Sequence, residues 1–457
     1  SFSGRALCGL HVAGKPSKRE GYAAILTHEM ALEAFKELDI VKDKFDEDLR
    51  DRGIELQCGD DMFIDTPSSF RLIGTVDKPI NICPETSYMR TEFYDTWGDS
   101  GMAPAALSPV FLNGKLVYPM VNAIAPYGTE VRILEQPYLR DAVYIATFRL
   151  SELTLGHSRK IFSFDEAIIG VPECKFRSIP RGTAAGFPYI YDVSGGKKAF
   201  FGFGDEYDLT GPMALQLRER VDHIILSAAR GERLATVFVD FLKDELRSHE
   251  KVRNVATRLI SSSPLDYTIA WRMYFGAFSS AFMRVHTKSG MAPGICAYTD
   301  WDVLCEQLQS KGPHVFDGDF KGFDASEQPT IMRLILDYVN EWYGDGPENA
   351  RIRTVLWEDL MHSRHIGGLG KCQKFIYQWS KSLPSGHPFT TILNSIYCLV
   401  CLVCAYLYNT GDRVGFWAHV SPITYGDDNV SNVSDERKST FNQETVATYL
   451  LSEFGMQ

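Results

Sequence analysis

The sequence lacks an excess of positive charge, a regular cysteine pattern and any repeated segment. Its 47 lysines and arginines stand against 58 aspartates and glutamates, which gives a net charge of −11. This balance argues against a generally basic nucleic-acid coat protein, although RNA contact can be confined to a locally basic channel. The ten cysteines have no regular spacing, which favours reduced thiols over a disulfide framework. We find no internal repeat, low-complexity tract or secretory signal.

The residues that are present suit a large globular protein. The 457 residues exceed a single small core, and a hydrophobic content of 45% can support a sizeable one. The aromatic share of 12% argues against disorder. The apolar stretch 396–407 is too short to span a bilayer unassisted, so we expect no transmembrane segment. It contains Cys398, Cys401 and Cys404, for which a buried helix is a better interpretation than a zinc site.

The most informative stretch is Tyr425-Gly426-Asp427-Asp428, which lies between strand-forming residues. Side chains at neighbouring strand positions point to opposite faces, so a strand cannot direct both carboxylates at one ion, whereas a tight turn can. That geometry suits a pair of Mg2+ ions. Taken alone, the tetrapeptide also fits a solvated hairpin tip, because these residues are common in turns.

A second acidic segment follows a short predicted strand. Residues 315–320 would deliver Asp319 as a third metal carboxylate, and Asp324 completes a D-x4-D pattern. Two metal ions about 3.5 to 4 Å apart activate a hydroxyl nucleophile and stabilise the leaving oxygen in phosphoryl transfer. Asp324 can instead be an acid just ahead of a helix, since a helix-periodic run follows and ends at Gly344. Asp317 is a spare ligand, an acid of raised pKa, or an outward-facing residue.

A third segment, 383–388, contains a glycine and two prolines and predicts a flexible loop that leads into an apolar helix. Ser385 and Gly386 can approach a sugar and its backbone closely. Thr390 follows, and Asn394 lies within the predicted helix, where it could hydrogen-bond a ribose hydroxyl. The alternative is an ordinary polar start of a helix.

In the order D-x4-D, S-G-x7-N and Y-G-D-D, the three segments resemble motifs A, B and C of the RNA-dependent RNA polymerases of picorna-like (Picornavirales) positive-strand RNA viruses. Residues 243–247, with Arg258 behind them, are similar to motif F, the basic finger over the nucleotide entry channel. Residues 183–188 are similar to motif G, which lines the template path. The resemblance runs from about Gly182 to the end of the chain.

The resemblance implies a role for each matching residue. Asp319, Asp427 and Asp428 would hold two Mg2+ ions, for which Mn2+ can substitute, with the backbone carbonyl of Phe320 as a further contact. The implied nucleotide-binding residues are Lys243, Arg247, Lys251, Arg258, Asp324, Ser385, Gly386, Thr390 and Asn394. The implied template path contains Thr183, Gly186 and Pro188. Within these sets, cationic side chains would neutralise the triphosphate, and the motif A and motif B polar pair would recognise the ribose 2′-hydroxyl.

The chain departs from the family pattern in motif F and at its carboxyl end. Many picornaviral relatives carry a glycine-lysine pair just before the threonine or serine of motif F, where this chain has Val255 and Ala256. The last predicted helix resembles the opening of motif D, and the chain stops at Gln457. We therefore expect the motif D lysine, motif E and the thumb to be absent.

The amino-terminal residues carry a separate, shorter resemblance. Ser1 stands in place of an initiator methionine, and residues 6–14 are similar to the last part of the chymotrypsin-like cysteine protease encoded upstream of these polymerases. His11 would then line the pocket for the substrate side chain. A strand, a glycine turn and a core histidine are the alternative. Gln57 before Cys58-Gly59 is a candidate processing junction, and the charged stretch ahead of it predicts an exposed helix or linker.

The resemblance implies a right-hand polymerase fold of the α/β (α+β) class, with fingers and palm and without a thumb, the palm being an antiparallel sheet packed on helices. The expected order is a protease remnant at 1–40, a linker or processing region at 41–57, fingers at 58–262, palm at 263–326, a fingers insertion at 327–375 and palm at 376–457. These borders are approximate.

The implied function is template-directed RNA synthesis in the host cytoplasm at viral replication complexes. The implied partners are an RNA template and primer, nucleoside triphosphates, a protein primer and other viral replication proteins. One alternative is a catalytically incomplete fragment that binds RNA or other polyprotein segments. Another is a reverse transcriptase, which shares an aromatic-x-Asp-Asp turn, although Asp324 with Asn394 favours ribonucleotides.

Overall fold

The structure, a computed structural model, describes residues 41–57, 70–81, 85–98, 100–132, 134, 138–369 and 372–457, together with four short strands nearer the amino terminus. Those strands form two antiparallel pairs, β1 (Phe2–Ser3) with β2 (Ala6–Leu7) and β3 (Gly9–Lys15) with β4 (Glu20–Ile25). His11 lies in β3, but its side chain is outside the described part of the chain, as is Cys58-Gly59. The protease remnant and the processing junction therefore stay predictions.

A six-stranded sheet forms one half of the molecule. Its strands are, in spatial order, β14 (Leu259–Ser262), β12 (Val237–Leu242), β16 (Arg364–Leu369), β17 (Cys372–Trp379), β7 (Phe70–Asn81) and β6 (Leu56–Gln57). Only the pair of β12 and β16 is parallel within this sheet. The sheet continues through Trp379, so β17 crosses the border predicted after residue 375.

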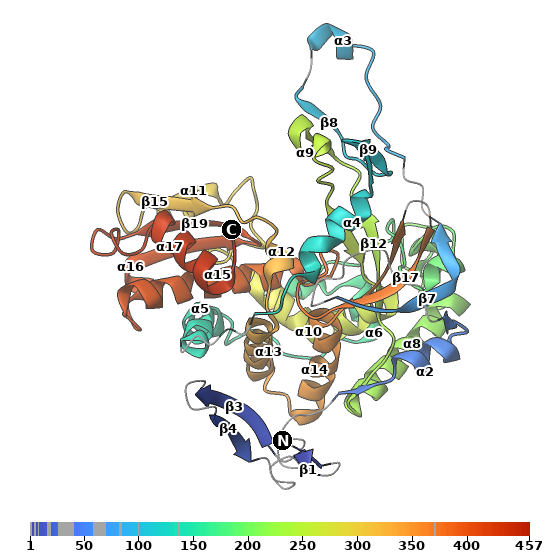
Figure 1. Ribbon diagram of the computed structural model, residues 1–457, viewed down its shortest axis with the longest axis horizontal. Helices are drawn as coiled ribbons and strands as arrows, with labels where there is room; N and C mark the ends of the chain where they lie inside the picture. The colour runs from blue at the N-terminus through green and yellow to red at the C-terminus, as the bar shows by residue number, and fades with distance from the viewer. Residues whose placement is uncertain are drawn as a thin grey trace.

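A smaller antiparallel sheet carries the acidic turn. Its strands are, in spatial order, β15 (His314–Gly318), β19 (Asp428–Val433) and β18 (Val420–Tyr425). Helix α15 (Thr390–Thr410) packs against β18, α5 (Leu139–Leu153) packs against α15, and α17 (Gln443–Tyr449) lies against β15 and α15. Figure 1 shows this sheet and its helices at the left, apart from the six-stranded sheet at the right.

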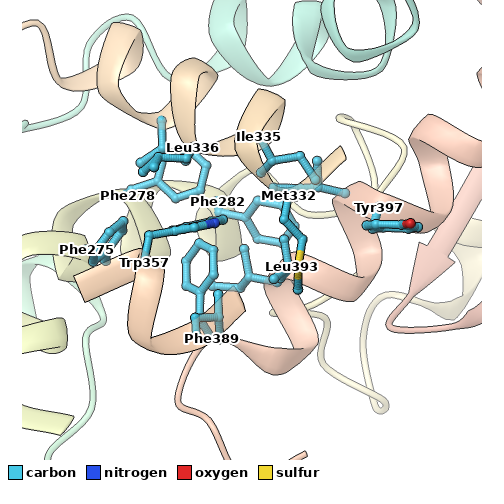
Figure 2. Close-up of a cluster of buried hydrophobic side chains, with 14 of the residues drawn as sticks. Phe275, Phe278, Phe282, Met332, Ile335, Leu336, Trp357, Phe389, Leu393 and Tyr397 are labelled. Atoms are coloured by element: carbon cyan, nitrogen blue, oxygen red, sulfur yellow. The ribbon is translucent and has the colours of Figure 1, made fainter. Parts of the chain in front are cut away.

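A helical core lies between the two sheets. Figure 2 shows Phe275, Phe278 and Phe282 of α10 (Leu265–Arg284) beside apolar residues of α13 (Pro329–Tyr343), Trp357 of α14 (Pro347–Met361) and the first turns of α15. α13 buries Ile331, Ile335, Tyr338 and Trp342, a helical spacing that places them on one face. It ends at Gly344 with a left-handed φ of 57°, as the sequence predicts.

Helix α15 explains the most apolar stretch of the sequence. Its residues from Ile392 to Leu407 are all buried, including the three cysteines, so the predicted buried helix is confirmed. Within the described residues, no group of three or more His, Cys, Asp or Glu side chains is arranged to hold a metal ion unaided. Among the described helices, α15 alone has the length and composition of a membrane span, and most of it is buried inside the fold.

Residues 41–57 contain the helix that was one of the two predicted alternatives, but this helix is exposed on one side only. α2 (Phe45–Asp51) buries Phe45 and Leu49, and β5 (Lys42–Asp43) pairs with β11 (Glu232–Arg233). Asp48 is also buried and accepts two hydrogen bonds from the Arg220 guanidinium at 2.6 and 2.7 Å. The charges that suggested an exposed segment are thus partly paired with residues far along the chain.

A protruding group of short elements stands above the six-stranded sheet in Figure 1. In it, β8 (Met102–Pro104) pairs with β13 (Leu246–Ser248), which is followed directly by α9 (His249–Arg253). β9 (Val110–Leu112) pairs with β10 (Lys115–Val117), and α3 (Tyr94–Trp97) lies at the tip.

The other described helices of the fold, outside the segments named so far, are α4 (Pro119–Ile124), η2 (Ala125–Gly128), α6 (Phe164–Ile169), η3 (Pro172–Cys174), η4 (Tyr189–Tyr191), α7 (Lys198–Phe201), α8 (Pro212–Ala229), α11 (Trp301–Gln307), α12 (Phe323–Ser326), α16 (Phe416–His419) and η5 (Leu450–Phe454).

Candidate active site

The acidic tetrapeptide forms the tight turn that the sequence predicts. β18 and β19 are joined by Gly426 and Asp427, with Tyr425 paired to Asp428. Gly426 has a φ of +65°, and a positive φ at the first turn residue is typical of the type II′ hairpin. α15 holds the turn from below, because the Gly426 N–H donates a 2.8 Å hydrogen bond to Ser395 Oγ. The two carboxylates are therefore presented on a short, supported hairpin.

Asp319 lies across the sheet from this turn. The register pairs Gly318 of β15 with Asn429 of β19, so Asp319 and Asp428 occupy the next facing positions. The Asn429 side chain joins the two segments, since its Nδ2 donates to Gly318 O at 3.1 Å and to Asp427 O at 3.2 Å. No role was predicted for Asn429, although its position directly after Asp427 and Asp428 could have indicated one.

The three carboxylates repel one another. Burial, followed by the charges of Asp428 and Asp319, raises the pKa of Asp427 above its ordinary value. Asp319 and Asp428 are exposed, Asp427 is half-buried, and Phe320 is half-buried beside Asp319. Carboxylate oxygens with unbalanced negative charge are the ligands that a hard divalent cation such as Mg2+ prefers, although these three side chains do not form a preformed metal-binding group in this structure. Asp317 is exposed on β15, as Asp319 is beyond the end of that strand.

Asp324 and Asn394 meet beside the acidic turn. Asn394 Nδ2 donates a 2.6 Å hydrogen bond to Asp324 Oδ1, joining α12 to the first turns of α15. Burial raises the pKa of Asp324 to about 6, and the negative charge of Asp427 acts in the same direction. Asn394 Oδ1 is buried and has no hydrogen-bond partner among the described residues. The pair therefore keeps one acceptor free, as recognition of a hydroxyl group requires.

The predicted basic strip converges on one acid. Glu245 forms ion pairs with Arg258 Nε at 2.6 Å, Arg247 Nη1 at 3.2 Å and Lys243 Nζ at 3.4 Å. Arg258 first, and then Lys243, lower the pKa of Glu245 to about 2. Glu245 lies within residues 243–247, the segment similar to motif F, but no role was predicted for it. Its position among closely spaced cations could have indicated that it pairs with them.

The other predicted cations differ in their surroundings. Lys251 lies on α9 in the protruding group, is exposed, and forms no ion pair within the described part of the chain. Arg258 is exposed, and its positive charge partly opposes the rise in the pKa of Asp427. Arg258 is therefore near enough to Asp427 for the two charges to interact, whereas Lys251 lies on α9 in the protruding group.

The predicted loop packs on strand β14. Ser385 Oγ donates to Leu259 O at 3.1 Å, and a Cβ on Gly386 would lie only 2.2 Å from Ser261 O. Thr390 Oγ1 donates to His387 O at 2.9 Å and so closes the loop on itself. Glycine at position 386 is thus needed for the close approach, whereas the Thr390 hydroxyl is occupied within the loop.

The predicted template residues lie at the beginning of α10, where the Leu265 N–H donates to Ala185 O at 2.9 Å. Thr183 is exposed, and its Oγ1 donates to Pro180 O at 3.1 Å. Gly186 is buried with a φ of +76°, and a Cβ there would lie 2.8 Å from Ser263 O. Pro188 is half-buried. No hydrogen bond among the described residues joins this segment to the acidic turn.

Comparisons with known proteins agree with this geometry. A model of the family described as viral RNA-dependent RNA polymerase matches residues 108–457. The replicase polyprotein of Acute bee paralysis virus (strain Rothamsted) is 31% identical over 97% of this chain, and that of Drosophila C virus (strain EB) is 29% identical over 97%. The chain spans about a quarter of the length of these relatives, 24% and 26% respectively.

A solved structure shows that the fold is also shared. The Sicinivirus 3Dpol RNA dependent RNA polymerase superposes with a TM-score of 0.69 and 20% sequence identity, covering 85% of this chain and 76% of that chain. The mixed arrangement of helices and sheets is therefore that of a viral polymerase, as the motifs imply. Together with the family match over most of its length, this establishes that the chain belongs to the viral RNA-dependent RNA polymerase family.

Proposed function

We propose that this chain carries out template-directed RNA synthesis, in which a primer 3′-hydroxyl attacks the α-phosphate of a ribonucleoside triphosphate and pyrophosphate leaves. The observation that carries the proposal is the convergence of Asp319 with the Asp427-Asp428 turn beside the Asp324–Asn394 pair. Carboxylates for metals and a polar pair for a sugar then share one site.

The carboxylates of Asp319, Asp427 and Asp428 fit two Mg2+ ions, with Mn2+ as a substitute and the Phe320 carbonyl as a further contact. Bound metals would activate the 3′-hydroxyl and offset charge on the leaving oxygen. The mutual repulsion that raises the pKa of Asp427 supports this assignment, because a cation relieves it. Asn429 positions the acids by bridging the two segments that bear them.

The remaining predicted residues handle the nucleotide. Arg258 lies nearest the acidic turn, where its guanidinium can bind phosphate oxygens in a bidentate manner. Lys243, Arg247 and Lys251 extend the positive strip toward solvent. Asp324 accepts from Asn394, which leaves Asn394 Oδ1 to accept a hydrogen bond from a ribose 2′-hydroxyl. A deoxyribose would leave that buried acceptor unpaired, which costs binding energy.

The same family membership supports the wider assignment. We assign the six-stranded sheet to the fingers and the three-stranded sheet to the palm, with the amino-terminal strands as the protease remnant. RNA template and primer, a protein primer and other replication proteins are the expected partners, at replication complexes in the host cytoplasm. The absence of a thumb stays a prediction.

Primer extension on an RNA template with Mg2+ tests the function. The chain is compared with a longer polyprotein segment that contains it, and each is prepared as the parent, Asp427→Asn and a control, Asp302→Asn. Asp302 is an exposed acid on α11 with no role in the site. We expect Asp427→Asn to lower extension by about 10^3-fold, because a metal ligand contributes several kcal/mol, while the control stays near the parent rate.

Each other outcome has a defined meaning. Extension by Asp427→Asn at the parental rate would remove the metal assignment. RNA binding without extension by either length would support the binding-fragment alternative. Equal use of deoxynucleotides and ribonucleotides would favour the reverse transcriptase.

A further inference from the structure

Residues 381–383 join helix α12 to the loop that contains Ser385 and Gly386. The Leu383 N–H donates to Asp324 O at 2.9 Å, and the Ser382 N–H donates to Glu327 O at 3.1 Å. Both acceptors are backbone carbonyls of the short segment that presents the Asp324 carboxylate. The loop segment is therefore hydrogen-bonded directly to the backbone that positions the proposed sugar-recognition pair.

A buried lysine adds to these bonds. Lys381 is 2% exposed, and its Nζ donates to Ala325 O at 2.5 Å, while Ser382 Oγ donates to the same oxygen at 3.0 Å. Within the described residues Lys381 forms no ion pair with an acid, and burial lowers its pKa to about 8. Burying an ammonium group without a counter-charge is costly. Lys381 is thus placed for its hydrogen bond to the residue that follows Asp324.

The backbone at this junction is also held in an unusual conformation. Ser382 has a φ of +79°, which non-glycine residues rarely adopt. Such a residue costs of order 1–3 kcal/mol and persists only where its surroundings impose it. Most of the surrounding bonds run to α12 and the residue after it, since three hydrogen bonds from Ser382 and Lys381 end on Glu327 O and Ala325 O. Ser382 Oγ also lies 3.2 Å from Tyr127 O in η2.

Helix α12 needs such support. It contains only four residues and has no side-chain cap, so its own hydrogen bonds cannot fix its orientation. The Asp324 carboxylate must nevertheless stay 2.6 Å from Asn394 Nδ2 to keep the Asn394 amide oriented. The carbonyls of residues 324, 325 and 327 are all held from the loop side.

We propose that Lys381 is a positioning residue for sugar selection: together with Ser382 it clamps α12, holds Asp324 toward Asn394, and couples that pair to the Ser385–Gly386 loop. This inference rests on the proposed function. It assigns to Lys381 no contact with the nucleotide. Its effect on the ribose is transmitted through α12.

The test measures preference for ribose over deoxyribose. For the parent, Lys381→Met, Lys381→Arg and the control Lys374→Met, kcat/KM is determined with ATP and with dATP in primer extension. Lys374 is an exposed lysine on the neighbouring strand β17. We expect Lys381→Met to reduce the ATP-to-dATP ratio by about tenfold, the loss of one charge-assisted hydrogen bond, and Lys381→Arg to restore part of it. The control should retain the parental ratio.

A role confined to stability would lower the amount of folded protein without changing the ratio. Dissociation constants for ATP and dATP with Mg2+ give a second readout that needs no turnover. Should Lys381→Met fail to fold, Ser382→Gly serves in its place, because glycine accepts the positive φ while the hydroxyl bond is lost. We expect this variant to reduce the ratio several-fold.

The outcomes separate the two proposals. A parental ratio in Lys381→Met, or in Ser382→Gly where only that variant folds, overturns the clamp and leaves the proposed function intact. A parent chain that neither extends primers nor binds ATP more tightly than dATP overturns both. A reduced ratio in both readouts, restored by arginine, supports the clamp.

Discussion

At the residue scale, the site is governed by carboxylates held in unlike surroundings. Asp427 lies close to the negative charges of Asp428 and Asp319, whereas Asp324 is buried and accepts a hydrogen bond from the Asn394 side chain. The first arrangement favours a cation and the second favours a hydrogen-bonded hydroxyl. Sequence order alone suggested both roles, because the acids stand at fixed spacings in recognisable motifs. It could not show that Asn394 donates to Asp324 or that Asn429 joins the segments that carry Asp319 and Asp427, since those contacts cross between elements.

Asp324 should make stability depend on pH. Its pKa is raised to about 6 from 3.8, so the folded state binds the proton more tightly. The resulting stabilisation is fully present below pH 3.8 and is lost as pH rises through 6. We expect the free energy of unfolding of the parent, relative to Asp324→Asn, to fall by on the order of 2 kcal/mol between pH 4 and pH 7. Urea unfolding at several pH values measures it, and a constant difference would contradict the assignment.

At the element scale, the loop and the strand beneath it act as one unit. Ser385 bonds to β14, residues 381–383 bond to α12, and Gly386 lies against Ser261 with no room for a side chain. The turn, α13 and α15 could be predicted because their signals are local: a short acidic turn between strands, a helical period and a long apolar run. The helix within residues 41–57 was among the predicted alternatives, but its buried face was not predicted, because Arg220, the partner of Asp48, lies far along the chain.

The substitution Gly386→Ala should separate the loop from β14. A Cβ at this position would lie 2.2 Å from the backbone oxygen of Ser261, so either the loop or the strand must move. We expect a loss of about 1 to 3 kcal/mol in the free energy of unfolding together with weaker nucleotide binding. Chemical denaturation and ATP titration measure the two effects. Gly204→Ala, where a Cβ meets nothing within 4 Å, is the matched control and should change neither.

At the scale of the whole molecule, the net charge is −11, so we expect RNA to contact a local group of cationic side chains. Lys251 and Arg253 are exposed on α9 in the protruding group, and Arg258 lies near the acidic turn. RNA binding should therefore depend on a few side chains and weaken with salt in proportion to their number. The composition predicted only that any such surface had to be confined; the pairing of β8 with β13 brings α9, with its exposed Lys251 and Arg253, into the protruding group.

Lys251→Ala tests this view of RNA binding. Each phosphate contact to single-stranded nucleic acid contributes about 0.7 to the slope of log affinity against log salt concentration. We expect the variant to reduce the slope by about that amount for RNA of any sequence. Fluorescence anisotropy between 50 and 200 mM salt, roughly the range in which the effect is large, provides the measurement. Lys438→Ala, whose lysine pairs with Asp435, should keep the parental slope.

The Glu245 carboxylate has a consequence for the order of events at this site. Before any nucleotide arrives, one internal anion already occupies the Lys243, Arg247 and Arg258 side chains and keeps them close together. A nucleotide that binds these cations must then displace the Glu245 carboxylate, which is already hydrogen-bonded to them. A triphosphate carries more negative charge and more oxygens than a monophosphate, so it competes better for three cations at once. We therefore expect competition from Glu245 to favour ligands with more phosphate groups, whatever their base.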